Sequence, residues 1–176
     1  MSREAYSRGW DHVKTYFMIG LPTERDEDVA AIADLAIRTV KEGKKVNQRA
    51  AVRTGVSTFV PKPFTPFQWE PMEEVQSLNR KQRFLEKAVK KIGNMNIIHD
   101  LPKWEYVQAL LSRGDRRVGR LIMAAHEKGG DWKAAAREIG MDADFYVTRP
   151  RDSAENLPWD FIDIGVRKDY LMNEYK

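Results

Sequence analysis

The sequence Val13-Lys14-Thr15-Tyr16-Phe17-Met18-Ile19 runs directly into Gly20-Leu21-Pro22. The first part is rich in β-branched and aromatic residues and carries a single charge, which predicts a buried strand that ends at the glycine and proline. The acidic run Asp26-Glu27-Asp28 follows, and it suits the start of a helix because the helix dipole is positive there. Apolar residues then recur at helical spacing as far as Gly43, where we expect the helix to stop.

A second strand and helix are predicted after this helix. Residues 44–53 are polar and basic, so we expect a loop there, followed by the apolar strand Val56-Ser57-Thr58-Phe59-Val60. Strand, helix and strand in this order indicate a βαβ unit of a parallel sheet. Residues 61–71 contain four prolines, which predicts an extended loop lined by aromatic side chains. An amphipathic helix is expected over residues 72–92.

The rest of the chain has a helical character. A short strand candidate, Asn96-Ile97-Ile98-His99, precedes Pro102, which can open a helix. Further helices are expected from Val118, Trp132 and Val166. The sequence therefore predicts an α/β region over residues 1–93 and a mainly helical extension over residues 94–176.

Composition narrows the class of protein. The 176 residues are 42% hydrophobic, and 30 basic and 26 acidic side chains are interspersed, as on a solvated globular surface. No apolar run approaches the roughly 20 residues that a membrane span needs, and the first residues lack a signal-peptide core, so we expect a cytoplasmic protein. Zero cysteines exclude disulfides and cysteine-held metal centres. His12, His99 and His126 lie far apart and predict no metal site.

Two segments together resemble a known family. They are Tyr16-Phe17-Met18-Ile19-Gly20-Leu21-Pro22-Thr23-Glu24 and Val60-Pro61-Lys62-Pro63-Phe64-Thr65-Pro66-Phe67. They resemble the fifth and sixth strands, with their outgoing loops, of the radical S-adenosylmethionine barrel of Fe–S oxidoreductases. The later Arg113-Gly114-Asp115-Arg116-Arg117 and Leu157-Pro158-Trp159-Asp160 are similar to an uncharacterised subfamily with an amino-terminal cobalamin-type domain. The resemblance covers almost the whole chain.

The resemblance implies a partial (βα) barrel with a helical carboxyl-terminal extension, and it implies where the cofactor binds. The backbone around Ile19 and Gly20, with Pro22 and the apolar Val60 and Pro61, would touch the adenine and sugar of S-adenosylmethionine. These residues would position the cofactor, and no catalytic residue is assigned. In the parent enzyme, the resemblance implies reductive cleavage of S-adenosylmethionine to a 5′-deoxyadenosyl radical, or cobalamin-dependent group transfer.

The chain also departs from the family pattern. The family holds its [4Fe–4S] cluster with a Cys-x-x-x-Cys-x-x-Cys loop, which this sequence lacks. We therefore expect an inactive carboxyl-terminal fragment whose partner is the missing amino-terminal barrel half, or a second copy that pairs with its exposed sheet edges. Arg25 replaces the usual capping threonine, and we expect Asp26 to cap the helix instead. Phe64 stands where the family has a smaller polar or imidazole group.

Other functions remain open from the sequence. A basic face could make the chain an RNA- or protein-binding module without catalytic activity; it comprises Arg80, Lys81, Arg83, Lys87, Lys90 and Lys91, together with Arg113, Arg116 and Arg117. The Pro63-x-x-Pro66 segment could be a polyproline-type ligand, although its aromatic neighbours favour packing onto the domain. Glu24 lies at the end of a strand, where a structural role is expected rather than acid–base chemistry.

Overall fold

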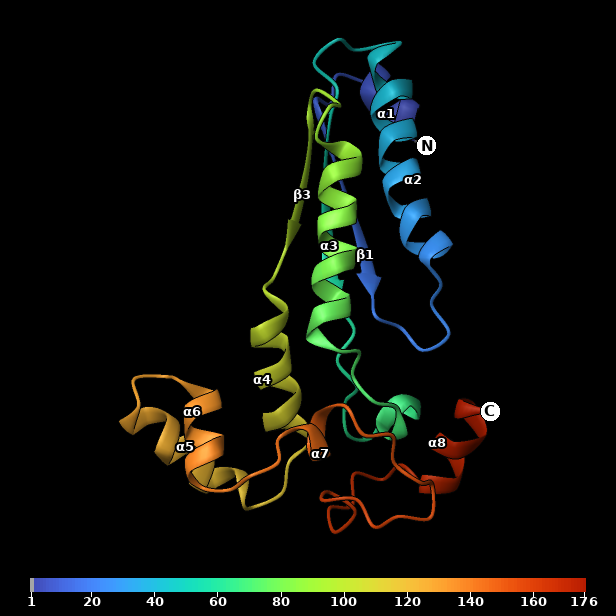
Figure 1. The fold of residues 1–176 in the computed structure, drawn as a ribbon. Coiled ribbons are helices and arrows are strands. Elements are labelled where there is room, and N and C mark those ends of the chain that lie inside the picture. Colours follow the sequence, from blue (N-terminus) through green and yellow to red (C-terminus); the bar gives the residue numbers. More distant parts are fainter. Residues whose placement is uncertain (1) are drawn as a thin grey trace. The chain divides into compact units, whose positions relative to one another are not determined.

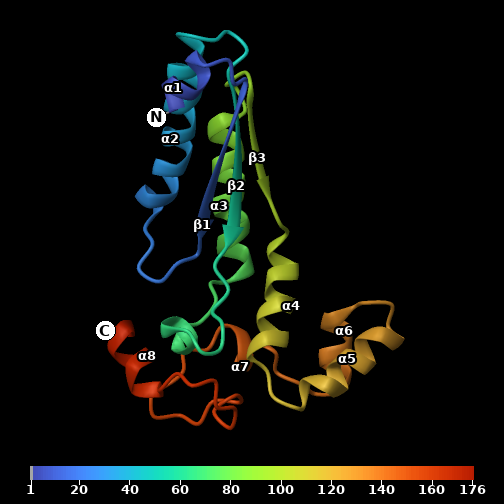
Figure 2. The ribbon, with the colours of Figure 1, turned by 180° about the vertical axis from the view of Figure 1, so that it is seen from behind.

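The computed structural model describes residues 2–176, and the chain divides into two compact units. The first unit runs to Phe59 and resumes over Val75–Pro102, and the second comprises Val60–Glu74 and Lys103–Lys176. Figures 1 and 2 show the elements of each unit from opposite sides. The structure is therefore mixed α/β. No helix among residues 2–176 is both long and apolar enough to cross a membrane.

The first unit is built on a parallel sheet of three strands in the order β1-β2-β3. Its elements are α1 (Ser2–Ser7), β1 (His12–Ile19), α2 (Asp26–Lys44), β2 (Ala51–Thr58), α3 (Val75–Val89) and β3 (Met95–His99). The predicted parallel pairing of the first two strands is confirmed, with Val13 opposite Val52 and Ile19 opposite Thr58. The strand predicted at residues 96–99 also exists, and it extends this sheet beside β2 instead of belonging to a helical region.

The boundaries predicted for the second strand are wrong. The strand begins at Ala51, inside the segment expected to be a loop, and ends at Thr58, before the predicted Val60. Alternation explains the error, because every second residue of β2 from Val52 is buried while Arg53 and Ser57 are exposed. A strand with one covered face alternates in this way, so its first half resembles a polar loop.

The helices of the first unit cover one face of its sheet. Val13, Val52 and Met95 share a row on the covered face, and Val52 packs in a core with Ala36 and Val40 of α2. Figure 2 shows the strands in front of α3, and Lys14, Tyr16 and Arg53 are exposed, so no helix within residues 2–59 and 75–102 covers the other face. The strands therefore follow one another in sequence order, with helices on one side of the sheet.

The start of α2 differs from the expectation in one detail. Its N-cap residue is Arg25, and the backbone N–H of Arg25 donates to the carboxylate of Asp28 at 2.9 Å. Asp28, rather than Asp26, therefore reaches back to the cap. The third helical residue is the one whose side chain can reach the N-cap backbone, as in a capping box.

The second unit is mainly helical. It contains η1 (Pro66–Trp69), α4 (Pro102–Arg113, apart from its first residue), α5 (Val118–Glu127), α6 (Trp132–Glu138), α7 (Asp144–Val147) and α8 (Lys168–Tyr175). The helices predicted from Pro102, Val118 and Trp132 are confirmed. The proline segment is tightened by the 3-10 turn η1 rather than extended throughout. Trp69 of that turn packs in a core with Leu157, Trp159 and Leu171.

Gly43 provides a test of the packing of α2 in the first unit. A β-carbon at Gly43 would lie 2.5 Å from the ring of Tyr6 and 2.8 Å from Ala50 Cβ. We expect Gly43→Ala to lower the free energy of unfolding by about 1–3 kcal/mol, because overpacking outweighs the gain in helix propensity. Gly119 of α5 has no such neighbours, so Gly119→Ala should raise the free energy of unfolding by up to about 1 kcal/mol. Urea denaturation measures the free energy of unfolding of both variants. Equal effects of the two substitutions would contradict the packing around Tyr6.

Candidate functional site at the carboxyl edge of the sheet

The carboxyl ends of β1 and β2 lie side by side. Ile19, the last residue of β1, is opposite Thr58, the last residue of β2. The pairing continues one residue further, because the Phe59 N–H donates to the Ile19 carbonyl at 2.8 Å. Ligands of parallel sheets bind at this edge, where the loops leave the strands.

A tight turn follows β1. Gly20 has a φ of 81°, in the left-handed region that glycine adopts without strain. The Glu24 N–H then donates to the Leu21 carbonyl at 3.1 Å, with Pro22 at the second turn position and Thr23 at a φ of 65°. This is the pattern of a type II turn, in which the third position usually holds glycine or asparagine. The threonine there costs backbone strain, which is often found at functional sites.

The turn brings the carboxylate of Glu24 back onto the end of β1. The Gly20 N–H donates to its two oxygens at 3.0 and 3.1 Å. Lys81 of α3 donates to the same carboxylate at 2.6 Å. The side chain of Lys81 is only 8% exposed, and that of Glu24 is 7% exposed. A buried pair of this kind holds a strand end against a helix, and removing one partner leaves a buried charge.

Lys81 therefore does not belong to an exposed basic face, contrary to the sequence-based expectation. It lies on the buried side of α3 with Leu78, Gln82 and Leu85. A signal for this position exists in the sequence, since residues 78, 81, 82 and 85 share one helical face. Glu24 is bonded to Gly20 and Lys81, and the partner in α3 was not predicted.

The predicted cofactor residues have distinct surroundings. Ile19 is fully buried and Gly20 is buried, so only their backbone could face a ligand; Pro22 is half-buried in the turn. Val60 and Pro61 are buried and lie two and three residues beyond the end of β2, where the second unit begins. Thr58 was not predicted as a site residue. Its buried hydroxyl has no hydrogen-bond partner in the described part of the chain.

Two features bear on what this edge could hold. Gly20 has no side chain and a positive φ, so a ligand could approach its backbone closely. An Fe–S cluster would need cysteine ligands, and the chain has no cysteine.

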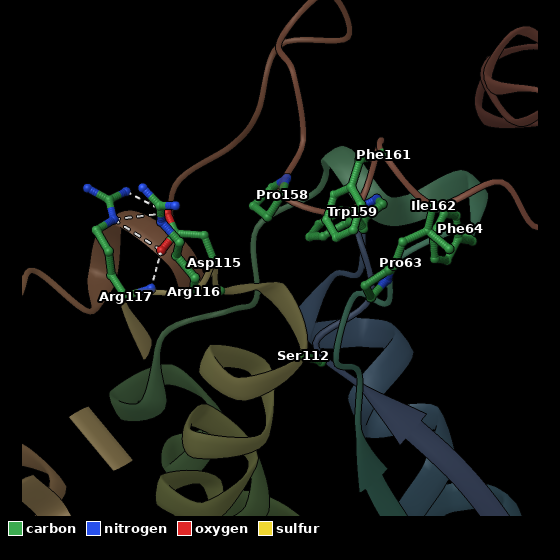
Figure 3. A pocket seen from close by; sticks show the side chains of 11 residues that line it. Pro63, Phe64, Ser112, Asp115, Arg116, Arg117, Pro158, Trp159, Phe161 and Ile162 are labelled. Atoms are coloured by element: carbon green, nitrogen blue, oxygen red, sulfur yellow. Dashed lines mark hydrogen bonds and ion pairs between the residues drawn. The ribbon is translucent and has the colours of Figure 1, made fainter. Parts of the chain in front are cut away.

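The second unit has a pocket of its own. Figure 3 shows it, and its volume is about 920 Å³. An apolar wall comprises Pro63, Phe64, Pro158, Trp159, Phe161 and Ile162, and a polar rim comprises Ser112, Asp115, Arg116 and Arg117. The Arg117 guanidinium bonds Asp115 through two nitrogens and lowers the pKa of that carboxyl to about 2. The charge of Arg117 is therefore already compensated.

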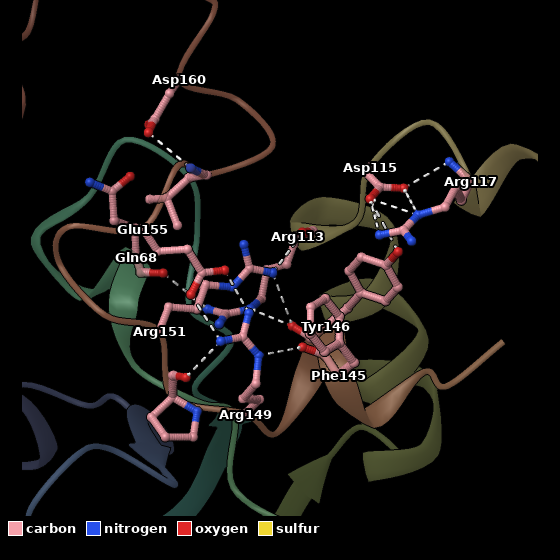
Figure 4. Close-up of polar contacts among 12 residues, drawn as sticks. Gln68, Arg113, Asp115, Arg117, Phe145, Tyr146, Arg149, Arg151, Glu155 and Asp160 are labelled. Atoms are coloured by element: carbon pink, nitrogen blue, oxygen red, sulfur yellow. Dashed lines mark hydrogen bonds and ion pairs between the residues drawn. The ribbon is translucent and has the colours of Figure 1, made fainter.

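Buried arginines organise the backbone of the second unit (Figure 4). Arg113 is fully buried, and its Nε donates to the Tyr146 carbonyl at 3.0 Å. Arg151 in turn donates to the Arg113 carbonyl at 2.9 Å. Burial lowers the pKa of Arg113 to about 10, which leaves the side chain charged at neutral pH. Arg113 is thus a structural residue and cannot contact RNA, which removes it, like Lys81, from the basic face considered above.

Comparisons with known proteins give one distant match. No family model matches the chain, and no solved structure matches it. The chain is 33% identical over 114 residues to a protein of Methanocaldococcus jannaschii that is described as uncharacterized. The match covers 65% of this chain and 24% of the relative, so the chain matches about a quarter of that protein's length.

The buried ion pair predicts a sharp difference between two lysines of α3. Lys81→Met should lower the free energy of unfolding by about 3–5 kcal/mol, because Glu24 would remain buried without its counter-charge. Lys87→Met, at an exposed position of the same helix, should change it by less than about 0.5 kcal/mol. Adding Glu24→Gln to Lys81→Met should restore part of the loss, since the amide oxygen can still accept from Gly20. Urea denaturation measures the free energy of unfolding of each variant. Similar effects of the two lysine substitutions would contradict the buried pair.

Proposed function

We propose that the chain is the carboxyl-terminal part of a radical S-adenosylmethionine enzyme and supplies one wall of its cofactor pocket. One observation carries the proposal: the two family-like segments lie at the carboxyl ends of strands that are parallel, adjacent and in register, and that end at one edge. The backbone of Ile19 and Gly20, with Pro22, Val60 and Pro61, would contact the adenine and sugar of the cofactor.

The architecture of the first unit supports a partial barrel. Sequential parallel strands with helices on a single face are the repeating element of a (βα) barrel, whereas doubly wound sheets have helices on both faces. In the described chain, β1 and β3 each have one neighbour in the sheet. In the parent enzyme these edges would pair with the remaining strands, and in the isolated chain they favour pairing between copies.

Each residue at this edge would have a positioning role. Gly20 leaves room for a planar adenine, and its N–H is already bonded to Glu24, so Glu24 and Lys81 would fix the shape of the loop rather than touch the ligand. S-Adenosylmethionine, when bound beside a reduced [4Fe–4S] cluster, supplies a 5′-deoxyadenosyl radical. That cluster, and any cobalamin, would be held by other parts of the parent, so this chain alone would be inactive.

Nuclear magnetic resonance of the isolated chain tests the proposal. Added S-adenosylmethionine should bind weakly and shift the amide signals of Gly20, Phe59 and Val60, because these residues flank the proposed adenine position. The amide of Gly140 in the second unit serves as the control and should not move. After addition of iron and sulfide under reducing conditions, no 5′-deoxyadenosine should form. Formation of 5′-deoxyadenosine, or millimolar cofactor without shifts at the sheet edge, would contradict the proposal.

A further inference from the structure

The face of the sheet that no helix of its unit covers has an unusual set of side chains. Its residues lie in rows fixed by the strand register: Lys14 beside Arg53 and Asn96, then Tyr16 beside Gly55 and Ile98, then Met18 beside Ser57. His12 precedes Lys14 on the same face. None of these positions is acidic. Asp11 and Asp100, the carboxylates next to the strand ends, lie outside the rows.

Lys14 and Arg53 are direct neighbours with the same charge. Adjacent parallel strands are about 4.8 Å apart, and like charges in this position destabilise a sheet. In the described part of the chain, neither side chain has an ion pair or a hydrogen bond. The covered face differs, since Thr15 and Thr54 bond each other at 2.9 Å there. The uncovered face therefore offers several N–H donors and no acceptor of opposite charge.

Tyr16 adds a flat apolar surface to this face. The tyrosine is 77% exposed, and its ring lies over Gly55, where a β-carbon would come within 3.1 Å of it. Glycine at that position lets the ring lie close to the sheet and leaves its outer side open. An exposed aromatic ring beside cations is the combination that binds a base and its phosphate in nucleic-acid-binding sheets.

We propose that this face binds a nucleotide, with the phosphate on Lys14 and Arg53 and the base stacked on Tyr16. The phosphate would supply the acceptor oxygens that the two cations lack and would remove their mutual repulsion. This site goes beyond the cofactor edge described above, from which it is separated by the row of Met18 and Ser57. Two neighbouring cations and one exposed ring match a single phosphate and a single base, so the proposed ligand is a free nucleotide.

Uridine compounds test this site without probing the adenine position at Gly20. Titration of the isolated chain by calorimetry or nuclear magnetic resonance should show that uridine monophosphate binds at least about ten times more tightly than uridine, because charged hydrogen bonds to the phosphate are strong. Lys14→Ala and Arg53→Ala should each weaken binding of the monophosphate about tenfold. Tyr16→Ala should weaken the monophosphate and the nucleoside alike. Lys87→Ala, on the exposed side of α3, is the matched control and should change nothing.

Two further measurements complete the design. Lys14→Glu should abolish binding, because the phosphate would meet a negative charge. The same variant should have a raised melting temperature, because the new carboxylate pairs with Arg53, and a cooperative melting transition shows that the variant is folded. A ten-residue oligouridylate should bind no more tightly than the monophosphate. Much tighter binding of the oligouridylate, with a strong salt dependence, would overturn the free nucleotide and identify a nucleic-acid strand as the ligand. No binding of either compound at millimolar concentration, or binding unchanged by the Lys14 and Arg53 substitutions, would overturn the proposal even if S-adenosylmethionine binds at Gly20.

Discussion

The arrangement of the first unit depends on the buried carboxylate of Glu24. It accepts from the Gly20 N–H and from Lys81, so one side chain connects the end of β1, the turn that follows and the helix α3. A carboxylate buried to this degree is costly unless its oxygens are bonded to donors and its charge is matched. Both conditions are met, and the result is a rigid loop at the edge of the sheet where parallel folds place their ligands.

The two faces of the sheet have opposite properties. On the covered face, polar groups such as Thr15 and Thr54 bond each other between apolar neighbours. On the other face, Lys14 and Arg53 lie side by side without a partner among the described residues. A sheet with one packed face and one face rich in donors is suited to be the wall of a chamber, which is consistent with the partial barrel that we propose.

Much of the fold could be predicted from the sequence, and the failures have physical causes. The segment Val13 to Ile19 is recognisable because β-branched and aromatic residues are concentrated there. The first half of β2 is not, because Arg53 and Gly55 point away from the core and interrupt the apolar pattern. The bond from Lys81 to Glu24 spans 57 positions in the chain. Local spacing can place Lys81 on a buried helix face but cannot identify its partner.

The account rests on the ends of β1 and β2 being parallel and adjacent, with the Gly20 turn held by Glu24. The most direct test is a nuclear magnetic resonance measurement on labelled protein of the scalar coupling across the hydrogen bond from the Phe59 N–H to the Ile19 carbonyl. We predict a resolved coupling there, together with slow exchange of the Gly20 amide. Close contacts between α-protons of opposite residues in β1 and β2 would indicate antiparallel strands and would contradict the account.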